Sequence, residues 1–201
     1  MKIVCLGDST TAGTPLFKSP LEAPPDGAGD ERSQFAYWLR QAQPEWQVTN
    51  CGVNGERSDQ IADRFDRDVR VPSPDVVVII AGVNDVYQGL PADHVTRQLQ
   101  RVYELAWACG IRVVAGTIVP YNTATADQNA RMHAINDWIR RYAADNPDRI
   151  CLADTRLAAA EPGNIDRLSG SPDDLHPDID GYRRMAGALE AAIRAGLARS
   201  Q

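Results

Sequence analysis

The chain has 201 residues, of which 43% are hydrophobic and 24% are charged, so it is long enough to bury the core of a single domain. Its 21 Lys and Arg residues against 27 Asp and Glu residues give a net charge of −6, which argues against nucleic acid or an anionic membrane as a partner. The longest strongly apolar run, residues 76–82, is far shorter than the roughly 20 apolar residues of a membrane-spanning helix.

The N-terminus and the cysteines bear on localisation and on cofactors. The first eight residues contain one basic residue and reach Asp8 before a signal-peptide core could develop, which predicts a cytoplasmic protein, or a secreted one if a leader has been removed. The four cysteines, at positions 5, 51, 109 and 151, lack the CxxC spacing of zinc sites and redox pairs. Three of the four fall in or beside apolar strand-like segments, so we expect these to be buried free thiols, and we expect no metal and no cofactor.

Strands and helices alternate along the chain. Five short segments rich in Val, Ile and Leu predict strands at residues 2–6, 47–51, 75–81, 111–117 and 149–153. Between them the apolar spacing predicts helices: one capped by Ser33 and ended by Pro44, one capped by Ser58, one from Pro91 to Gly110, one ending before Asn146, and one over residues 177–198. The mixed-charge run 63–68 predicts a solvated helix face.

This alternation predicts an α/β fold with a mostly parallel five-stranded sheet and helices on both faces. The chain shows no internal repeat and no linker, so residues 1–201 are expected to form one domain. One stretch, residues 14–32, holds four prolines and two glycines without periodicity. A loop of that length is uncommon in a compact domain, so we expect it to be an active-site loop or mobile.

Small and polar residues follow the predicted strands, at residues 7–13, 52–55, 82–85 and 173–177. In open α/β sheets, ligands bind beyond the carboxyl ends of the strands, so these four segments are expected to converge on one edge. The sequence therefore predicts a single site built from four distant segments.

These segments contain the groups that acyl transfer needs. Ser9 follows the first strand on a tight turn and is the candidate nucleophile. Of the three histidines, His94 and His133 fall on predicted helices and are expected at the surface, which leaves His176 as the base. Asp173 lies three residues earlier and can orient the imidazole, although Asp174 is a rival acid.

The negative charge that develops on the substrate oxygen needs hydrogen-bond donors. The main-chain amides of Ser9 and Gly52 and the side-chain amide of Asn84 are of the right type, and together they form the predicted oxyanion hole. Asp8 and Asp85 are expected to organise their turns. A phosphate-binding loop at residues 7–13 is a poorer reading, because the segment lacks both the GxxxxGK[ST] lysine and the GxGxxG spacing.

In this order, the four blocks resemble those of the SGNH hydrolases, also called GDSL esterases and lipases. Gly7-Asp8-Ser9 resembles the first block, Gly52 the second, residues 82–85 the third and residues 173–176 the last. The resemblance implies a flavodoxin-like three-layer sandwich, Ser9 as nucleophile, His176 as base and Asp173 as its orienting acid. It also implies Ser9, Gly52 and Asn84 as the oxyanion hole. Thr10 stands where many members carry leucine, which removes no catalytic group.

The resemblance implies a serine esterase that hydrolyses carboxylic esters through an acyl-enzyme. The modest aromatic content of 6% favours small acyl esters over bulk lipid. Candidate substrate contacts are Arg57 after the second strand and Val119 and Tyr121 after the fourth. An acyltransferase and a non-catalytic carbohydrate or lipid binder on the same fold remain alternatives, and the oligomeric state stays open.

Overall fold

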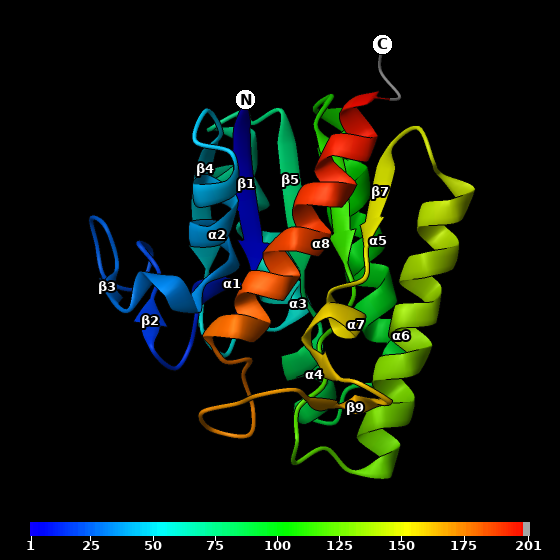
Figure 1. The fold of residues 1–201 in the computed structure, drawn as a ribbon. Helices are drawn as coiled ribbons and strands as arrows, with labels where there is room; N and C mark the ends of the chain where they lie inside the picture. Colours follow the sequence, from blue (N-terminus) through cyan, green and yellow to red (C-terminus); the bar gives the residue numbers. More distant parts are fainter. Residues whose placement is uncertain (199–201) are drawn as a thin grey trace.

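The computed structural model describes residues 1–198 and contains a sheet of five parallel strands in the order β4-β1-β5-β6-β7 (Figure 1). The strands are β1 (Lys2–Gly7), β4 (Gln47–Gly52), β5 (Val76–Ile80), β6 (Arg112–Gly116) and β7 (Ile150–Ala153). All five lie where the apolar segments predicted them, and every neighbouring pair is parallel. The predicted α/β fold is confirmed.

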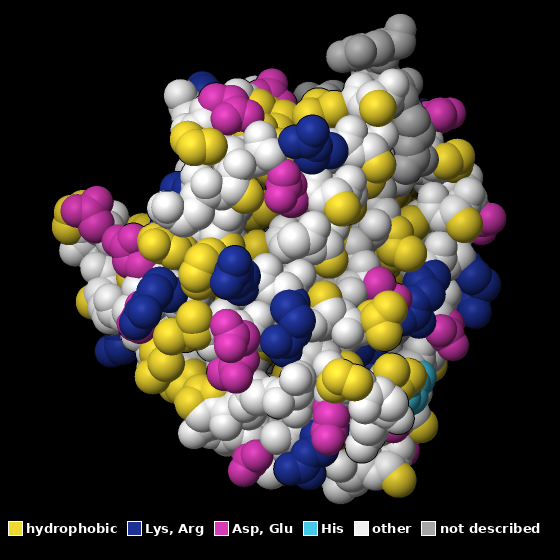
Figure 2. Space-filling view, in the orientation of Figure 1, with side chains coloured by type: hydrophobic (Ala, Val, Ile, Leu, Met, Phe, Trp, Pro, Cys, Tyr) yellow, Lys and Arg dark blue, Asp and Glu magenta, His cyan; other side chains and the backbone are white. Residues whose placement is uncertain are grey.

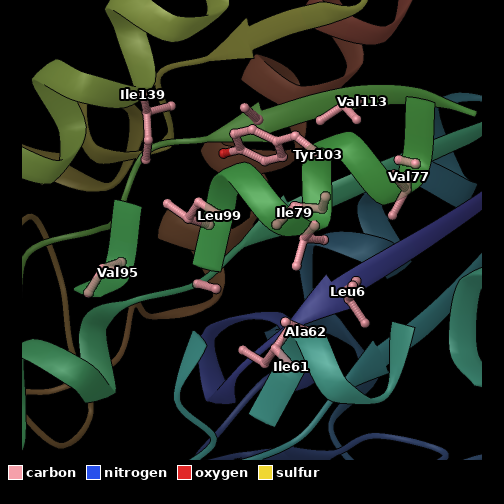
Figure 3. Close-up of a cluster of buried hydrophobic side chains, with 14 of the residues drawn as sticks. Leu6, Ile61, Ala62, Val77, Ile79, Val95, Leu99, Tyr103, Val113 and Ile139 are labelled. Atoms are coloured by element: carbon pink, nitrogen blue, oxygen red, sulfur yellow. The ribbon is translucent and has the colours of Figure 1, made fainter. Parts of the chain in front are cut away.

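Helices cover both faces of the sheet, which makes three layers. On one face lie α2 (Phe35–Ala42) and α8 (Ile179–Ala198); on the other lie α3 (Ser58–Asp63), α5 (Ala92–Ala108) and α6 (Ala126–Asp145). Side chains of β5 alternate between the two interfaces: Val77 and Ile79 pack towards α5, and Val76 and Val78 pack towards α8. Figure 3 shows the first interface, where Leu99 and Tyr103 of α5 meet Ile79. Burial on both faces explains why this strand is a continuous apolar run.

Several short elements were not expected from the sequence. They are the helices α1 (Ser9–Ala12), α4 (Val83–Tyr87) and α7 (Thr155–Ala159), the irregular turns at Glu31–Ser33 and Asp66–Arg70, and two hairpins, β2 (Phe17–Lys18) with β3 (Ala28–Gly29) and β8 (Ala160–Glu161) with β9 (Asn164–Leu168). The segment 14–32 therefore contains a small hairpin and a helical turn. Strands of two residues are too short to produce a periodic pattern.

The two predicted serine caps are wrong. Helices α2 and α3 begin after Gln34 and Arg57, and neither serine hydroxyl caps a helix. The Ser33 hydroxyl donates to the Gly13 carbonyl at 2.9 Å, and the Ser58 hydroxyl donates to the Asp85 carboxylate at 2.7 Å. The Ser33 hydroxyl thus contacts the residue that ends α1, and the Ser58 hydroxyl links α3 to α4.

The mixed-charge run is only in part the solvated face that its pattern predicts: Asp63, Asp66 and Arg67 are exposed, whereas Arg64 and Asp68 are buried. Arg64 is only 8% exposed and pairs with Asp68, which is 4% exposed, at 2.6 Å. The Arg64 guanidinium donates to the Gly7 carbonyl and to the Cys51 carbonyl, both at 2.8 Å. A buried cation thus ties together the carboxyl ends of β1 and β4, from which two of the site segments emerge.

Charged side chains of both signs share the surface. On the face in Figure 2, Lys and Arg side chains are interspersed with Asp and Glu side chains. Within residues 1–198, no helix is long and apolar enough to cross a membrane.

Candidate active site

Segments that follow four strands of the sheet, and the segment that precedes α8, meet around a cavity of about 180 Å³. Its lining consists of Ser9, Thr10, Asn54, Val83, Asn84, Tyr87, Tyr121, Leu175 and His176. A larger, more open hollow of about 640 Å³ lies at the other edge of the sheet beside Trp107 and Arg149, and its described lining contains no Ser, Thr or His side chain. Of these two hollows, the smaller one holds the predicted nucleophile Ser9 and the predicted base His176.

Ser9 is held at the first position of α1, directly after β1. The Asp8 side chain accepts a hydrogen bond from the Thr10 amide at 3.0 Å and so caps this short helix. Ser9 is 3% exposed, and its hydroxyl faces the His176 ring. Within the described chain its own amide has no hydrogen-bond partner, which leaves that N–H free to donate.

The three groups of the predicted triad form a continuous chain of contacts. The Nε2 atom of His176 lies 2.9 Å from Ser9 Oγ, and its Nδ1 atom lies 2.7 Å from Asp173 Oδ2. The other carboxylate oxygen of Asp173 accepts hydrogen bonds from the amides of Leu175 at 3.0 Å and His176 at 2.8 Å. Partial burial alone would raise the pKa of Asp173, but the hydrogen bonds from His176 and Leu175 hold this pKa below its usual value.

The rival acid is turned away from the imidazole. The Asp174 carboxylate accepts a hydrogen bond from Asn122 Nδ2 at 2.9 Å, and its main-chain carbonyl accepts one from the Asn122 amide at 2.8 Å. Asp173 is therefore the carboxylate that contacts His176, while Asp174 contacts Asn122 in the segment that follows β6.

Asn84 lies in the cavity with its side-chain amide fixed from one side. Its Nδ2 atom donates to the Glu56 carbonyl at 2.9 Å, which occupies one of its two hydrogens. The second hydrogen is available to a substrate oxygen. Asp85, the next residue, is fully buried and accepts from the Ser58 amide at 2.8 Å, so it fixes α4 against the start of α3.

The structure does not bring Gly52 to the cavity, contrary to the prediction. Its amide donates to Asn50 Oδ1 at 2.9 Å, and a Cβ added at this glycine would overlap the backbone of Ala12. Gly52 thus allows β4 and α1 to pack closely. Gly55, three residues later, has φ +79°, and its amide has no partner in the described chain. It lies between Asn54, which lines the cavity, and Glu56, which holds Asn84.

Of the three expected substrate contacts, one lines the cavity. Tyr121 does so, with its ring 6.0 Å from the ring of Tyr87 in an edge-to-face arrangement. Val119 is 2% exposed and belongs to the core beneath α8. The Arg57 guanidinium donates to both carboxylate oxygens of Asp59, each at 3.0 Å, and does not line the cavity.

Five residues of the cavity lining were not predicted from the sequence: Thr10, Asn54, Val83, Tyr87 and Leu175. Tyr87 of α4 is 60% exposed and Leu175 is 37% exposed, so both present apolar surface beside His176. A large apolar side chain next to a predicted catalytic residue is the signal that could have identified them, since exposed apolar surface often marks a binding site.

The segment 14–32 contacts the site without entering it. No residue of this segment lines the cavity as described. Its Ser19 hydroxyl donates to the Gly52 carbonyl at 2.6 Å, and its Glu22 carboxylate accepts from the Asn54 amide at 3.1 Å. The segment therefore supports the loop after β4, one residue of which lines the cavity.

The two other histidines each face an aspartate. His133 Nε2 lies 2.6 Å from Asp166 Oδ1, and His94 Nε2 lies 3.7 Å from Asp85 Oδ1. Neither ring contacts a hydroxyl nucleophile among the described residues. Ligand atoms of Asp59, Asp85 and His94 approach within 4.8 Å of one another, but Asp59 is paired with Arg57 and Asp85 with Ser58. These partners already occupy the carboxylates.

The buried carboxyl group of Asp8, which precedes Ser9, is expected to make the free energy of unfolding depend on pH. Burial raises the pKa of Asp8 from 3.8 to about 7, against the hydrogen bond from Thr10 and with a further contribution from nearby Asp85. Between these values the folded protein holds a proton that the unfolded chain releases, so stability falls as pH rises from about 4 to 7.

Asp8→Asn removes this titration and keeps an oxygen for the Thr10 amide. We expect the stability of the variant relative to the parent to improve by about 2 kcal/mol between pH 5 and pH 8, measured by urea unfolding. Asp26→Asn, a substitution at an exposed carboxyl, is the control and should show no such trend. A stability difference for Asp8→Asn that does not change with pH would contradict the assignment.

Comparisons with known proteins identify the family and the fold of the chain. The model of the GDSL-like lipase/acylhydrolase family matches residues 5–184. No curated protein matches the chain.

Solved structures share the fold over nearly the whole chain. A lipolytic protein of the G-D-S-L family from Desulfitobacterium hafniense is 22% identical, with a TM-score of 0.77 over 95% of this chain and 98% of that one. An acetyl xylan esterase is 22% identical, with a TM-score of 0.75 over 96% and 100%. A psychrotrophic esterase from Pseudoalteromonas is 18% identical, with a TM-score of 0.71 over 98% of both chains.

The family model spans most of the chain, including the segments that bear Ser9, Asn84 and His176. The chain therefore belongs to the GDSL-like lipase/acylhydrolase family, the SGNH hydrolases, and is a carboxylic ester hydrolase.

Proposed function

We propose that this hydrolase is a serine esterase in which Ser9 is the nucleophile, His176 the general base and Asp173 the group that orients the base. The observation that carries the proposal is the unbroken series of contacts from Asp173 through His176 to Ser9, at 2.7 Å and 2.9 Å. The ionised Asp173 carboxylate accepts a hydrogen bond from Nδ1–H of His176, which leaves the Nε2 lone pair directed at the serine hydroxyl.

The reaction follows from this arrangement. As Ser9 Oγ bonds to the ester carbonyl carbon, its proton moves to His176 Nε2 and the carbonyl electron pair moves to oxygen. Collapse of this intermediate breaks the ester bond, and the departing alkoxide takes the proton from His176. Water then attacks the acyl-serine by the same steps and releases the carboxylic acid.

The oxyanion is stabilised by the Ser9 amide and by the second hydrogen of Asn84 Nδ2. We assign the third donor to the Gly55 amide, because the Gly52 amide is occupied by Asn50. Asn84→Ala is expected to lower kcat by about 10²- to 10³-fold, since this hydrogen bond is strongest when charge develops on the oxygen. Hydrolysis of p-nitrophenyl acetate per titrated active site measures the effect.

Gln88→Ala is a matched control, because Gln88 follows the same short helix and does not line the cavity. Its kcat should stay close to that of the parent. A normal kcat in Asn84→Ala would mean that the oxyanion is held by other groups.

The proposed function is tested by covalent labelling combined with product analysis. A fluorophosphonate should modify Ser9 alone, as identified by peptide mass spectrometry, and a short ester should yield free acid. A non-catalytic binder would not be labelled. An acyltransferase would be labelled but would transfer the acyl group to added glycerol in preference to water, and that result would favour the alternative.

We further propose that the substrate is a small, water-soluble acyl ester. The cavity of about 180 Å³ is smaller than the 300–1,000 Å³ pockets that bind drug-sized ligands, and Tyr121 and Tyr87 narrow it. Rates along a series of p-nitrophenyl esters should be highest for acetate to butyrate. A preference for long acyl chains would overturn this proposal without affecting the assignment of Ser9.

A further inference from the structure

The segment that carries Asp173 and His176, residues 169–178, contains neither helix nor strand. Its base is closed by the Asp178 amide, which donates to the Gly170 carbonyl at 3.0 Å. Within the described chain, hydrogen bonds from residues 171–177 to other segments involve only Ser9 and Asn122. Because Ser9 is the group on which His176 acts, Asn122 is the contact that fixes this loop from outside.

Asn122 lies in the segment after β6, next to Tyr121 of the cavity lining. Its amide donates to the Asp174 carbonyl at 2.8 Å, and its Nδ2 donates to Asp174 Oδ1 at 2.9 Å. Its Oδ1 accepts from the Leu168 amide at 2.8 Å, at the end of β9. Asn122, in the segment that follows β6, thus links residues 171–177 to the β8–β9 hairpin and to the carboxyl edge of the sheet.

The residue that Asn122 holds has an uncommon backbone conformation. Asp174 has φ +61°, in the left-handed region that few residues other than glycine adopt, although Asp and Asn adopt it more readily than most. Asp174 lies between Asp173 and His176 in the chain. The turn at Asp174 therefore sets how the Asp173 carboxylate faces the His176 ring. Two hydrogen bonds to the same residue hold it in that conformation.

We propose that Asn122 is a positioning residue for His176, which keeps His176 Nε2 in place against Ser9 Oγ by fixing the conformation of Asp174. The inference rests on the proposed function, in which that contact is the path of the proton. Asn122 itself does not line the cavity and contacts neither Ser9 nor His176 in the described structure.

Three variants test the proposal. Asn122→Asp keeps the size of the side chain and the acceptor for Leu168, but it places a carboxylate against that of Asp174. The double variant Asn122→Asp/Asp174→Asn restores a side-chain hydrogen bond with donor and acceptor exchanged, and asparagine also tolerates the left-handed conformation. Thr123→Ala changes an exposed neighbour on the same segment and is the control.

For Asn122→Asp we expect kcat per fluorophosphonate-titrated site to fall by about 10- to 100-fold, because small misplacements of a base are costly. KM should change by less than about twofold, because no substrate contact is lost. The double variant should recover most of the loss, and Thr123→Ala should match the parent. An equal loss in both Asn122 variants, or a loss only in the number of titrated sites, would overturn the proposal.

A second measurement does not depend on turnover. In a proton NMR spectrum, the signal of the Nδ1 proton of His176 is identified as the signal that is missing from the spectrum of His176→Ala. Its signal should shift or broaden in Asn122→Asp and return in the double variant. If the parent neither hydrolyses esters nor reacts with fluorophosphonate, the proposed function fails. The positioning role of Asn122 is then tested by the signal of the His176 Nδ1 proton alone. An unchanged signal in Asn122→Asp refutes that role.

Discussion

Ser9→Ala should lower kcat for p-nitrophenyl acetate by about 10⁶-fold, to a residual rate set by binding and the oxyanion donors alone. The substitution removes Ser9 Oγ, which lies 2.9 Å from His176 Nε2 and is the hydrogen-bond partner of that nitrogen among the described residues. The folded state should survive, because the hydroxyl makes no other hydrogen bond in the described chain and the smaller side chain creates no clash. Steady-state hydrolysis and a thermal unfolding curve measure both expectations.

Ser19→Ala is a suitable comparison for this experiment. It also removes a buried hydroxyl near the carboxyl edge of the sheet, but the Ser19 hydroxyl donates to the Gly52 carbonyl and does not reach the imidazole. Fluorophosphonate labelling should persist in Ser19→Ala and disappear in Ser9→Ala. Undiminished hydrolysis by purified Ser9→Ala would remove the serine mechanism altogether.

Asp173→Asn should lower kcat by about 10⁴-fold, by analogy with other triads. An asparagine oxygen can still accept from the amides of Leu175 and His176, so the loop should keep its shape. Its NH₂ group would instead donate to His176 Nδ1, which places the ring proton on Nε2, where it faces Ser9 and blocks proton acceptance. KM should change little, because Asp173 does not line the cavity.

The neighbouring carboxylate provides the comparison for this prediction. Asp174→Asn changes the same chemical group one residue away, on a side chain that contacts Asn122 and not His176. Its loss of kcat should be far smaller than that of Asp173→Asn. The reverse order of effects would assign the orienting role to Asp174 and contradict the geometry.

The sheet could be predicted from the sequence because burial on both faces leaves continuous apolar runs, as in Val76–Ile80. The site segments could be predicted because parallel strands place their carboxyl ends at one edge. The proposed oxyanion glycine could not be predicted, since Gly52 at the end of β4 and Gly55 three residues later both carry a main-chain amide of the right type. The side chain of Asn50, which accepts from the Gly52 amide, makes the difference, and only the folded chain shows that contact.

Charged residues show a similar limit. The pattern of Asp and Arg at residues 63–68 is typical of a solvated face, yet Arg64 is buried, and its guanidinium donates hydrogen bonds to carbonyls of β1 and β4. The sequence distinguishes His176 from His94 and His133 because the other two fall on predicted helices, and because an acid lies three residues before His176. In the structure, His94 and His133 also face aspartates, which come from 9 and 33 residues away in the chain. His176 is distinguished by its second ring nitrogen, which alone faces a serine hydroxyl.

The contact between Glu22 and the Asn54 amide suggests where substrate range can be altered by design. The loop that bears Asn54 begins at Val53, whose amide donates to the Gly7 carbonyl at 3.1 Å, and ends at Glu56, whose carboxylate pairs with Arg64 at 2.6 Å. Both ends are thus anchored to the sheet, while Asn54 between them lines the cavity. Combinatorial libraries that vary Glu22 and Asn54 together would reshape the pocket wall and leave the positions of Ser9 and His176 untouched.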